Sequence, residues 1–285
     1  PGVSIVVPSG LVSSSSSGLD DAGRAGSITV TADTVELSNR AQIAATTVAG
    51  GTVADRGDIT LNVNTLLATT DAVVNAATTG GGQAGNITVN GVAGPDSQAL
   101  NVALGARSGL ATSTTGAGSA GDITVQANSV TVSDSSGQAE LSGIVSSSAD
   151  DPARPKATGK AGNITVTADA VTVVDGGQIA ATTVDGDGQP GQAGGDGGNI
   201  TLNVGTLGLS DGGQVTAATG GAGEAGDIEI VADSVSLGSQ AGLVTSAGGT
   251  GSAGDINIVA GSVTVGGSTG AAGQSGITSA SLGEN

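Results

Sequence analysis

The chain has 285 residues, of which 25 are Asp or Glu and 7 are Lys or Arg, and it contains no Cys, His, Met, Trp, Tyr or Phe. These absences exclude catalytic triads, zinc and haem sites that need His or Cys, and aromatic platforms that stack bases or sugars. The net charge of −18 argues against a nucleic-acid partner, because that affinity comes from Lys and Arg.

The sequence contains no membrane span, because no apolar run approaches the ~18 residues that a spanning helix needs. No basic segment followed by an apolar stretch opens the chain, as it would in a signal peptide. The chain also begins at Pro1 without Met, and we therefore expect it to start at a processed or excised end.

A short phrase recurs along the chain, consisting of a small residue, then Asp, Asn or Ser, then Ile, a polar residue and an aliphatic residue. Its Ile residues follow one another at 28 residues or at 28 plus an insertion, and we count offsets within each coil from them. They are Ile28, Ile59, Ile87, Ile123, Ile164, Ile200, Ile228 and Ile256. A fixed period of this length is typical of a solenoid.

Apolar residues alternate within each coil at offsets 0, 2 and 4, again at 7 and 9, and once more at 15. The coil that starts at Ile164 shows this with Val166, Ala168, Val171 and Val173. Alternation with period 2 predicts three short, half-buried strands per coil.

Polar residues mark the corners between these strands. The residue before each leading Ile is Asp, Asn or Ser, and we expect its side chain to bond the next turn or to stack on its equivalents. The residue at offset 5 is Asp, Asn or Gly, which predicts a left-handed backbone there. The offset-5 residues are Asp33, Asn64, Asn128, Asp169, Gly205, Asp233 and Gly261.

Taken from the N-terminus, residues 1–24 predict a partial first coil, in which Val3, Ile5 and Leu11 occupy offsets 7, 9 and 15. Eight coils follow over residues 25–285. Neither end shows a polar cap, so we expect either a segment of a longer rod or ends that stack on another copy.

Insertions fall only at the predicted corners. The first long one lies between Val89 and Val102, and later ones place Ile144 and Ile277 at offset 15. Stacked coils require this rule, because a slip of one residue within a strand turns its apolar face outward. The sequence therefore predicts an all-β fold, a right-handed parallel β-helix with coils about 4.8 Å apart in a single solenoid over 1–285.

The repeat AGNITVTADAVTVVDGGQIAATT at 161–183 resembles those of filamentous-haemagglutinin-type exoproteins, especially the long cyanobacterial haemagglutination-like proteins secreted by the two-partner route. The resemblance covers the chain from Val3 to about Ala280. It implies a secreted or surface-anchored bacterial rod used in adhesion, surface coating or filaments, and it carries over no catalytic residue. The family's secretion domain is not recognisable here.

Two groups of acidic residues are candidate calcium ligands. Asp227 and Asp255 lie in adjacent coils, about 5 Å apart, where like charges raise a pKa or recruit a cation. Asp185, Asp187 and Asp196 lie in a Gly-rich stretch that superficially resembles a calcium-binding nonapeptide, although it occurs only once and its Asp phase differs. We favour corner hydrogen bonding for the first group and a plain loop for the second, with no cofactor.

A basic loop is the candidate partner site. Arg154, Lys156 and Lys160 lie in a third-corner insertion, one coil from the acidic stretch at 185–196. Solenoids often bind through loops on one face, although we favour a simple tolerated insertion as the explanation of these residues.

The row of Thr at offset 1, from Thr29 to Thr201, does not indicate ice binding, because offset 3 holds a mixture of Thr, Asn, Gln and Val. A carboxylate-based polysaccharide enzyme is disfavoured too, since the Gly-rich loops are too short to wall a groove.

The sequence favours a non-catalytic structural or adhesive segment of an extracellular bacterial β-solenoid. The alternatives are a polysaccharide-binding or polysaccharide-active β-helix and a calcium-stabilised surface-layer filament. The expected partners are further copies, end to end or side by side, or a cell-surface polysaccharide.

Overall fold

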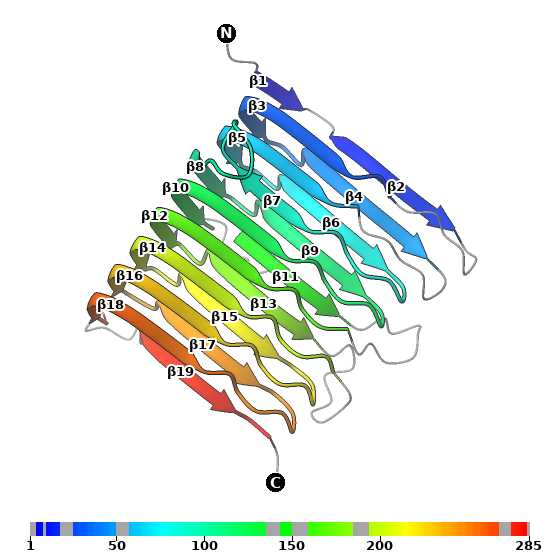
Figure 1. Cartoon of the computed structure of the whole chain (residues 1–285). Coiled ribbons are helices and arrows are strands. Elements are labelled where there is room, and N and C mark those ends of the chain that lie inside the picture. Colours follow the sequence, from blue (N-terminus) through cyan, green and yellow to red (C-terminus); the bar gives the residue numbers. More distant parts are fainter. Residues whose placement is uncertain are drawn as a thin grey trace.

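The computed structural model of the chain describes residues 4–7, 10–17, 25–49, 57–134, 143–149, 159–184, 194–267 and 275–283. Within these residues every strand pairs in parallel with strands of the neighbouring coils, and the strands form two sheets that run the length of the stack (Figure 1). The predicted all-β parallel β-helix is therefore confirmed.

Sheet A holds the strands that lie between offsets 0 and 10 of each coil. In stacking order it contains β1 (Ser4–Val7), β3 (Ile28–Leu37), β5 (Ile59–Ala68), β7 (Ile87–Asn90) with β8 (Ala99–Gly105), β10 (Ile123–Ser133), β12 (Ile164–Val174), β14 (Ile200–Leu209), β16 (Ile228–Leu237) and β18 (Ile256–Val265).

Sheet B holds the strand of each coil that begins at or just before offset 15. In stacking order it contains β2 (Leu11–Ser17), β4 (Gln42–Ala49), β6 (Val73–Thr79), β9 (Gly109–Thr115), β11 (Gly143–Ala149), β13 (Gln178–Val184), β15 (Gln214–Thr219), β17 (Gly242–Ala247) and β19 (Gly276–Ser281).

Except in the coil where residues 91–98 separate β7 from β8, the first two predicted strands of a coil are joined into one bent strand of sheet A. In β12, burial alternates through Ile164 and Ala168, is interrupted where Asp169 and Ala170 both face outward, and resumes at Val171. The residue at offset 5, for example Asp169, is skipped in the strand pairing between neighbouring coils. The bend is thus made by two successive outward residues, and it needs no break in the strand.

The left-handed backbone predicted at offset 5 is wrong, because the non-glycine residues with positive φ lie instead at offsets 11 and 12. Asn39 and Arg40 have φ of 54° and 65°, and the N–H of Ala41 donates to the Ser38 carbonyl, 3.1 Å away. Two left-handed residues inside such a bond make a type I′ turn. This turn repeats along the stack and joins sheet A to sheet B.

The predicted insertion between Val89 and Val102 is confirmed. β7 and β8 pair side by side with β10, so they correspond to one strand interrupted by residues 91–98. Ile144 pairs with Leu110 and with Ile179, as its predicted offset requires. The other predicted insertions lie wholly or mostly outside the described residues.

The predicted register of the first coil is partly wrong. Leu11 pairs with Ile43, as expected, but Ile5 pairs with Val35 at offset 7 and Val7 pairs with Leu37 at offset 9. The connection from Val7 to Leu11 is therefore two residues shorter than the connection from Leu37 to Ile43. Val3 lies outside the described residues.

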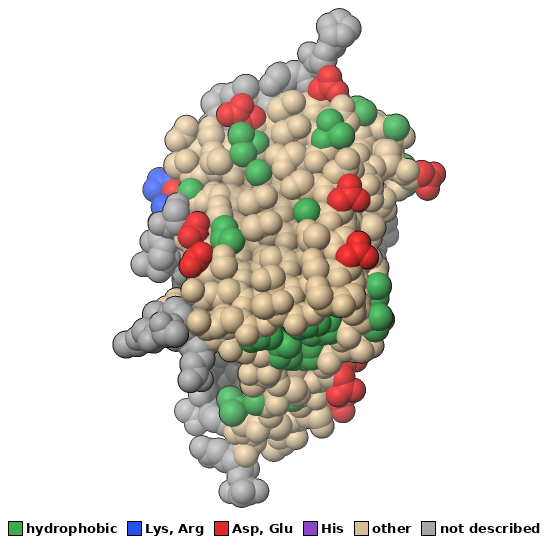
Figure 2. All heavy atoms as spheres, turned by 90° about the vertical axis from the view of Figure 1, so that its left-hand side faces the viewer, with side chains coloured by type: hydrophobic (Ala, Val, Ile, Leu, Met, Phe, Trp, Pro, Cys, Tyr) green, Lys and Arg blue, Asp and Glu red, His purple; other side chains and the backbone are tan. Residues whose placement is uncertain are grey.

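The core is a narrow column of aliphatic side chains between the two sheets. Ile59, Ile87, Ile123, Ile164 and Ile200 are all 0% exposed at offset 0. At the last rung the inward-facing Val263, Val265 and Ile277 are 43–49% exposed, because β18 and β19 have a neighbouring rung on one side only. Figure 2 shows hydrophobic side chains gathered towards this end of the stack.

Candidate functional site

Where the structure describes the connection from a sheet B strand to the next leading Ile, a wall rich in Gly and Ala closes the coil. At its edge runs the row of Asp, Asn and Ser residues at offset −1, which we call the Asx ladder. Its members are Ser27, Asp58, Asn86, Asp122, Asn163, Asn199, Asp227 and Asp255. In each successive pair the main-chain N–H of the later residue donates to the side-chain oxygen of the earlier one, over 2.7–3.3 Å.

The backbone of the ladder bonds in the opposite direction as well. The N–H of Ile164 donates to the Asn199 carbonyl, 2.9 Å away, and that of Ile200 donates to the Asp227 carbonyl, 2.8 Å away. Each pair of neighbouring corners is therefore joined twice, once through the side chain of the earlier ladder residue and once through the main-chain carbonyl of the later one. Because the side chain only accepts, Asn and Asp serve equally well.

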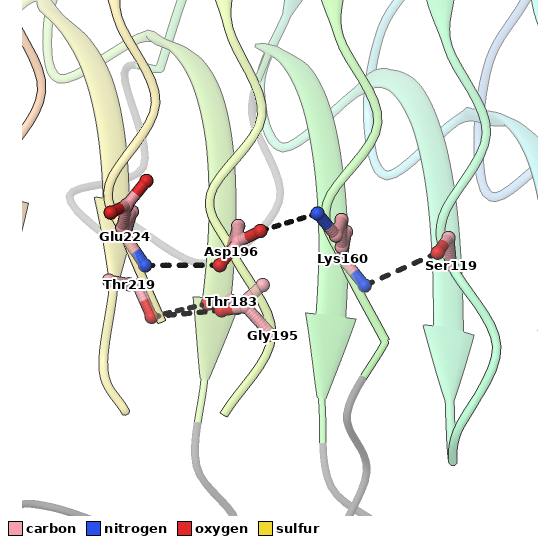
Figure 3. Close-up of polar contacts among 7 residues, drawn as sticks. All are labelled: Ser119, Lys160, Thr183, Gly195, Asp196, Thr219 and Glu224. Atoms are coloured by element: carbon pink, nitrogen blue, oxygen red, sulfur yellow. Dashed lines mark hydrogen bonds and ion pairs between the residues drawn. The ribbon is translucent and has the colours of Figure 1, made fainter. Parts of the chain in front are cut away.

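A second polar row lies three residues before the ladder, at offset −4 (Figure 3). The N–H of Lys160 donates to the Ser119 hydroxyl over 3.4 Å, and the N–H of Glu224 donates to Asp196 Oδ1 over 3.1 Å. Between them, Lys160 Nζ lies 2.5 Å from Asp196 Oδ2. The side chain of Lys160 has no acceptor for an N–H of the next coil. Its ion pair with Asp196 connects these two coils instead.

The ion pair shifts the pKa of both Lys160 and Asp196. The hydrogen bond from Lys160 holds the pKa of Asp196 below its ordinary value, and the N–H of Glu224 adds to this effect, whereas partial burial opposes it. The hydrogen bond to Asp196 raises the pKa of Lys160. Since Lys160 is largely exposed and Asp196 is partly exposed, water screens the pair and it contributes little to the free energy of unfolding.

The wall between the two polar rows is lined by glycine because the coils approach too closely for side chains. A Cβ added to Gly85, Gly121, Gly162 or Gly198 would overlap the carbonyl oxygen of the equivalent glycine one coil earlier. This glycine column stands at offset −2 and continues to Gly254. It appears in the sequence as the invariable Gly before each member of the Asx ladder, a signal that the sequence reasoning did not use.

Buried hydroxyls fix the wall to the inner face of sheet B. Ser146 accepts from the Gly162 N–H over 2.8 Å and donates to the Gly121 carbonyl over 3.0 Å. Thr245 donates to the Gly254 carbonyl over 2.7 Å. These inward polar residues also went unpredicted, although they recur two and four residues after offset 15.

The two polar rows border a shallow trough along the wall. One stretch has a volume of about 450 Å³ and runs from Lys160 to Asp255, with the carboxylates of Asp196, Glu224 and Asp227 at its edges. Another stretch, of about 190 Å³, is lined partly by Lys160 as well. The trough offers hydrogen-bond acceptors and a flat floor of small residues, and it suits a polar, extended ligand.

Among the proposed calcium ligands, Asp227 and Asp196 have other partners for their carboxylates. Asp227 Oδ1 accepts from the Asp255 N–H over 2.8 Å, and Asp196 pairs with Lys160. Asp185 and Asp187 lie outside the described residues, and within the described part no group of three or more acidic side chains is arranged to hold a metal ion. Calcium binding stays a prediction, which a thermal melt with and without Ca²⁺ tests.

The predicted basic loop is described only at its end, because Arg154 and Lys156 lie outside the described residues. A different basic group was not predicted. Arg107 Nη2 lies 2.6 Å from Asp71 Oδ1, and Arg40 Nε lies 3.8 Å from Asp71 Oδ2. All three stand at offset 12 of successive coils, so carrying the coil register through the sequence would have revealed them.

The described residues include no helix long and apolar enough to cross a membrane. No protein-family model, no curated protein and no solved structure matches the chain. The site's geometry is thus the basis for a functional proposal.

Proposed function

We propose that the chain is a non-catalytic structural or adhesive segment of a bacterial β-solenoid that is secreted or held at the cell surface. The observation that carries this proposal is the unbroken Asx ladder, which joins every coil from Ser27 to Asp255. Polar side chains that would serve chemistry in an enzyme serve here to join one coil to the next.

The composition supports the same proposal. Without His and Cys, general acid–base and nucleophilic chemistry would rest on carboxylates, lysines and hydroxyls alone. The sequence resemblance to filamentous-haemagglutinin-type exoproteins agrees with an extracellular rod that acts through its length and its surface, in adhesion, coating or filaments.

Two assays on the purified chain test this proposal. The labelled chain, layered on bacterial cells and washed, should be retained, whereas retention no greater than that of an unrelated acidic protein contradicts adhesion. Incubation with acidic and neutral polysaccharides should release no new reducing ends and no unsaturated products, and measurable cleavage contradicts the non-catalytic part.

A second candidate function is binding of a neutral polysaccharide in the trough along the glycine-rich wall. The trough favours it because carboxylates accept hydrogen bonds from sugar hydroxyls, whereas a polyanion would be repelled. Replacement Glu224→Ala removes one exposed carboxylate from the trough and should weaken such binding. The matched change Glu36→Ala, in β3 on the outer face of sheet A, should leave it unaltered.

A further inference from the structure

The outer face of sheet B differs from the rest of the molecule in charge. None of its nine strands contains Asp, Glu, Lys or Arg, although 11% of the whole chain is charged and several such residues would be expected. Sheet A carries Asp33 and Glu36 in β3, Asp169 in β12 and Glu229 in β16. Charge is therefore absent from one whole side of the described rod.

The uncharged side matters because the net charge is −18. Two copies that met through other sides would bring carboxylates together, and like charges oppose association. Across sheet B the outward residues are neutral, with Gln and Val at some positions and small residues at many others, for example Ala111, Ser147, Thr182 and Thr216. Such residues allow two sheets to approach to the ~10 Å of face-to-face packing.

We propose that two copies of this chain associate side by side through the outer faces of sheet B. Strands of six to eight residues in nine rungs give a face of roughly 40 by 20 Å, or about 800 Å². That is the area each partner contributes to a stable interface of standard size. The inference goes beyond the proposed function, because a rod can act in adhesion alone or in pairs.

The shape of the outer face of sheet B suits a second copy of this chain. A hollow of about 540 Å³ runs over the strands from β4 to β15, with Ala111 and Ala180 in its lining. Gln42, Gln178 and Gln214 line one edge of the hollow at the same offset. In a two-fold pair each copy presents the same hollow and the same row of amides. Glutamine side chains are long enough to enter the partner's hollow and hydrogen-bond there.

Sedimentation of the whole chain tests this proposal. The wild type should sediment as a species of twice 26.3 kDa, and pairing should strengthen as salt screens the net charge. Replacement Thr182→Glu places a charge in the middle of the face and should weaken pairing at least ten-fold. The matched replacement Thr172→Glu, in the same coil on the outer face of sheet A, has the same net charge and should pair like the wild type.

A second variant separates desolvation from simple repulsion. Thr182→Lys lowers the net negative charge, yet it should also weaken pairing, because a charge buried between two sheets loses water whatever its sign. Circular dichroism should show each variant folded. A wild type that stays monomeric at every salt concentration overturns the proposal, and so does equal weakening by the Thr182 and Thr172 replacements.

Discussion

At the residue scale, side-chain oxygens at two offsets join successive coils. Ser27, Asp122 and Asn163 each accept from a backbone N–H of the next coil, although their charges and lengths differ. What the position requires is an acceptor within reach of the next N–H, not a carboxylate. The sequence showed that these residues recur, and the structure shows which atom of each is used.

Removing one acceptor should therefore cost one hydrogen bond. In Asn163→Ala the N–H of Asn199 loses its partner at 3.0 Å, and we expect a loss of about 1 kcal/mol in the free energy of unfolding. Asn163→Asp keeps an oxygen in place and should cost less than half as much. Denaturant titration of the two variants measures the difference, and equal losses would contradict the ladder.

The Lys160–Asp196 pair predicts a pH dependence. Since the pKa of Asp196 is lowered in the folded chain, its contribution is present above its ordinary value of 3.8 and is lost as pH falls through the lowered value. The pKa of Lys160 is raised, so its contribution persists up to its ordinary value of 10.5 and is lost as pH rises through the raised value.

The effect of Asp196→Asn on the thermal midpoint should thus be constant between about pH 5 and pH 9, and it should shrink as pH falls below the ordinary pKa of Asp196 and through the lowered one. The control is Asp169→Asn, since Asp169 is exposed and has no ion-pair partner among the described residues. An Asp196→Asn effect that persists undiminished into strong acid would show that the pair has been misidentified.

At the element scale, the alternation of apolar residues was sufficient to predict the strands, but it did not predict the corner conformations. Offset 5 carries Asp and Asn although its backbone is not left-handed, and in the first two coils their side chains bond to each other, Asn64 Nδ2 to Asp33 Oδ1 over 2.7 Å. The residues with a left-handed backbone include Ala106 and Arg107, and neither Ala nor Arg is a residue type that predicts this conformation. Their conformation follows from stacking on equivalent turns, which a single coil's sequence does not reveal.

The glycine column makes a sharp prediction about close approach. Gly162→Ala would push a methyl group into the Gly121 carbonyl oxygen, so the backbone has to move, and we expect a loss of about 2 kcal/mol or more. A Cβ at Gly208, on the outer face of β14, meets no atom within 4 Å. Gly208→Ala should therefore leave the thermal midpoint unchanged or raise it slightly. Similar losses in the two variants would contradict the packing of the wall.

The insertion between β7 and β8 should be dispensable. A variant that lacks residues 91–98 joins Asn90 directly to Ala99 and so restores a coil of 28 residues. The register need not change, because β7 and β8 already pair with consecutive parts of β10. Closing a loop of this length has a small free-energy cost, so the melting midpoint should move by only a few degrees. Deleting Thr167 alone, inside β12, should instead disrupt the stack because it reverses the strand's apolar face. A greater loss from the eight-residue deletion would contradict the assignment of the corner.

At the scale of the whole molecule, the chain is a one-dimensional stack in which each coil contacts its neighbours and little else. Its surface is divided accordingly: acidic groups lie at the corners, along the wall and on sheet A, while sheet B is neutral over all its strands. The sequence predicted the stack because its period is visible in a single chain. It did not predict that acidic residues are absent from the strands of sheet B. That pattern is visible only when residues at the same offset in successive coils are compared.

Hydrogen exchange of individual amides, followed by NMR, tests most directly the central claim that the Asx ladder joins the coils into one rod. The N–H groups of Asn86, Asp122, Asn163, Asn199 and Asp227 lie at exposed or half-buried corners outside the strands. The ladder nevertheless predicts that they exchange slowly, at rates close to those of the leading Ile N–H groups beside them, because both are bonded between coils. Exchange of the ladder N–H groups at the rates of unstructured peptides, beside protected Ile N–H groups, would contradict it.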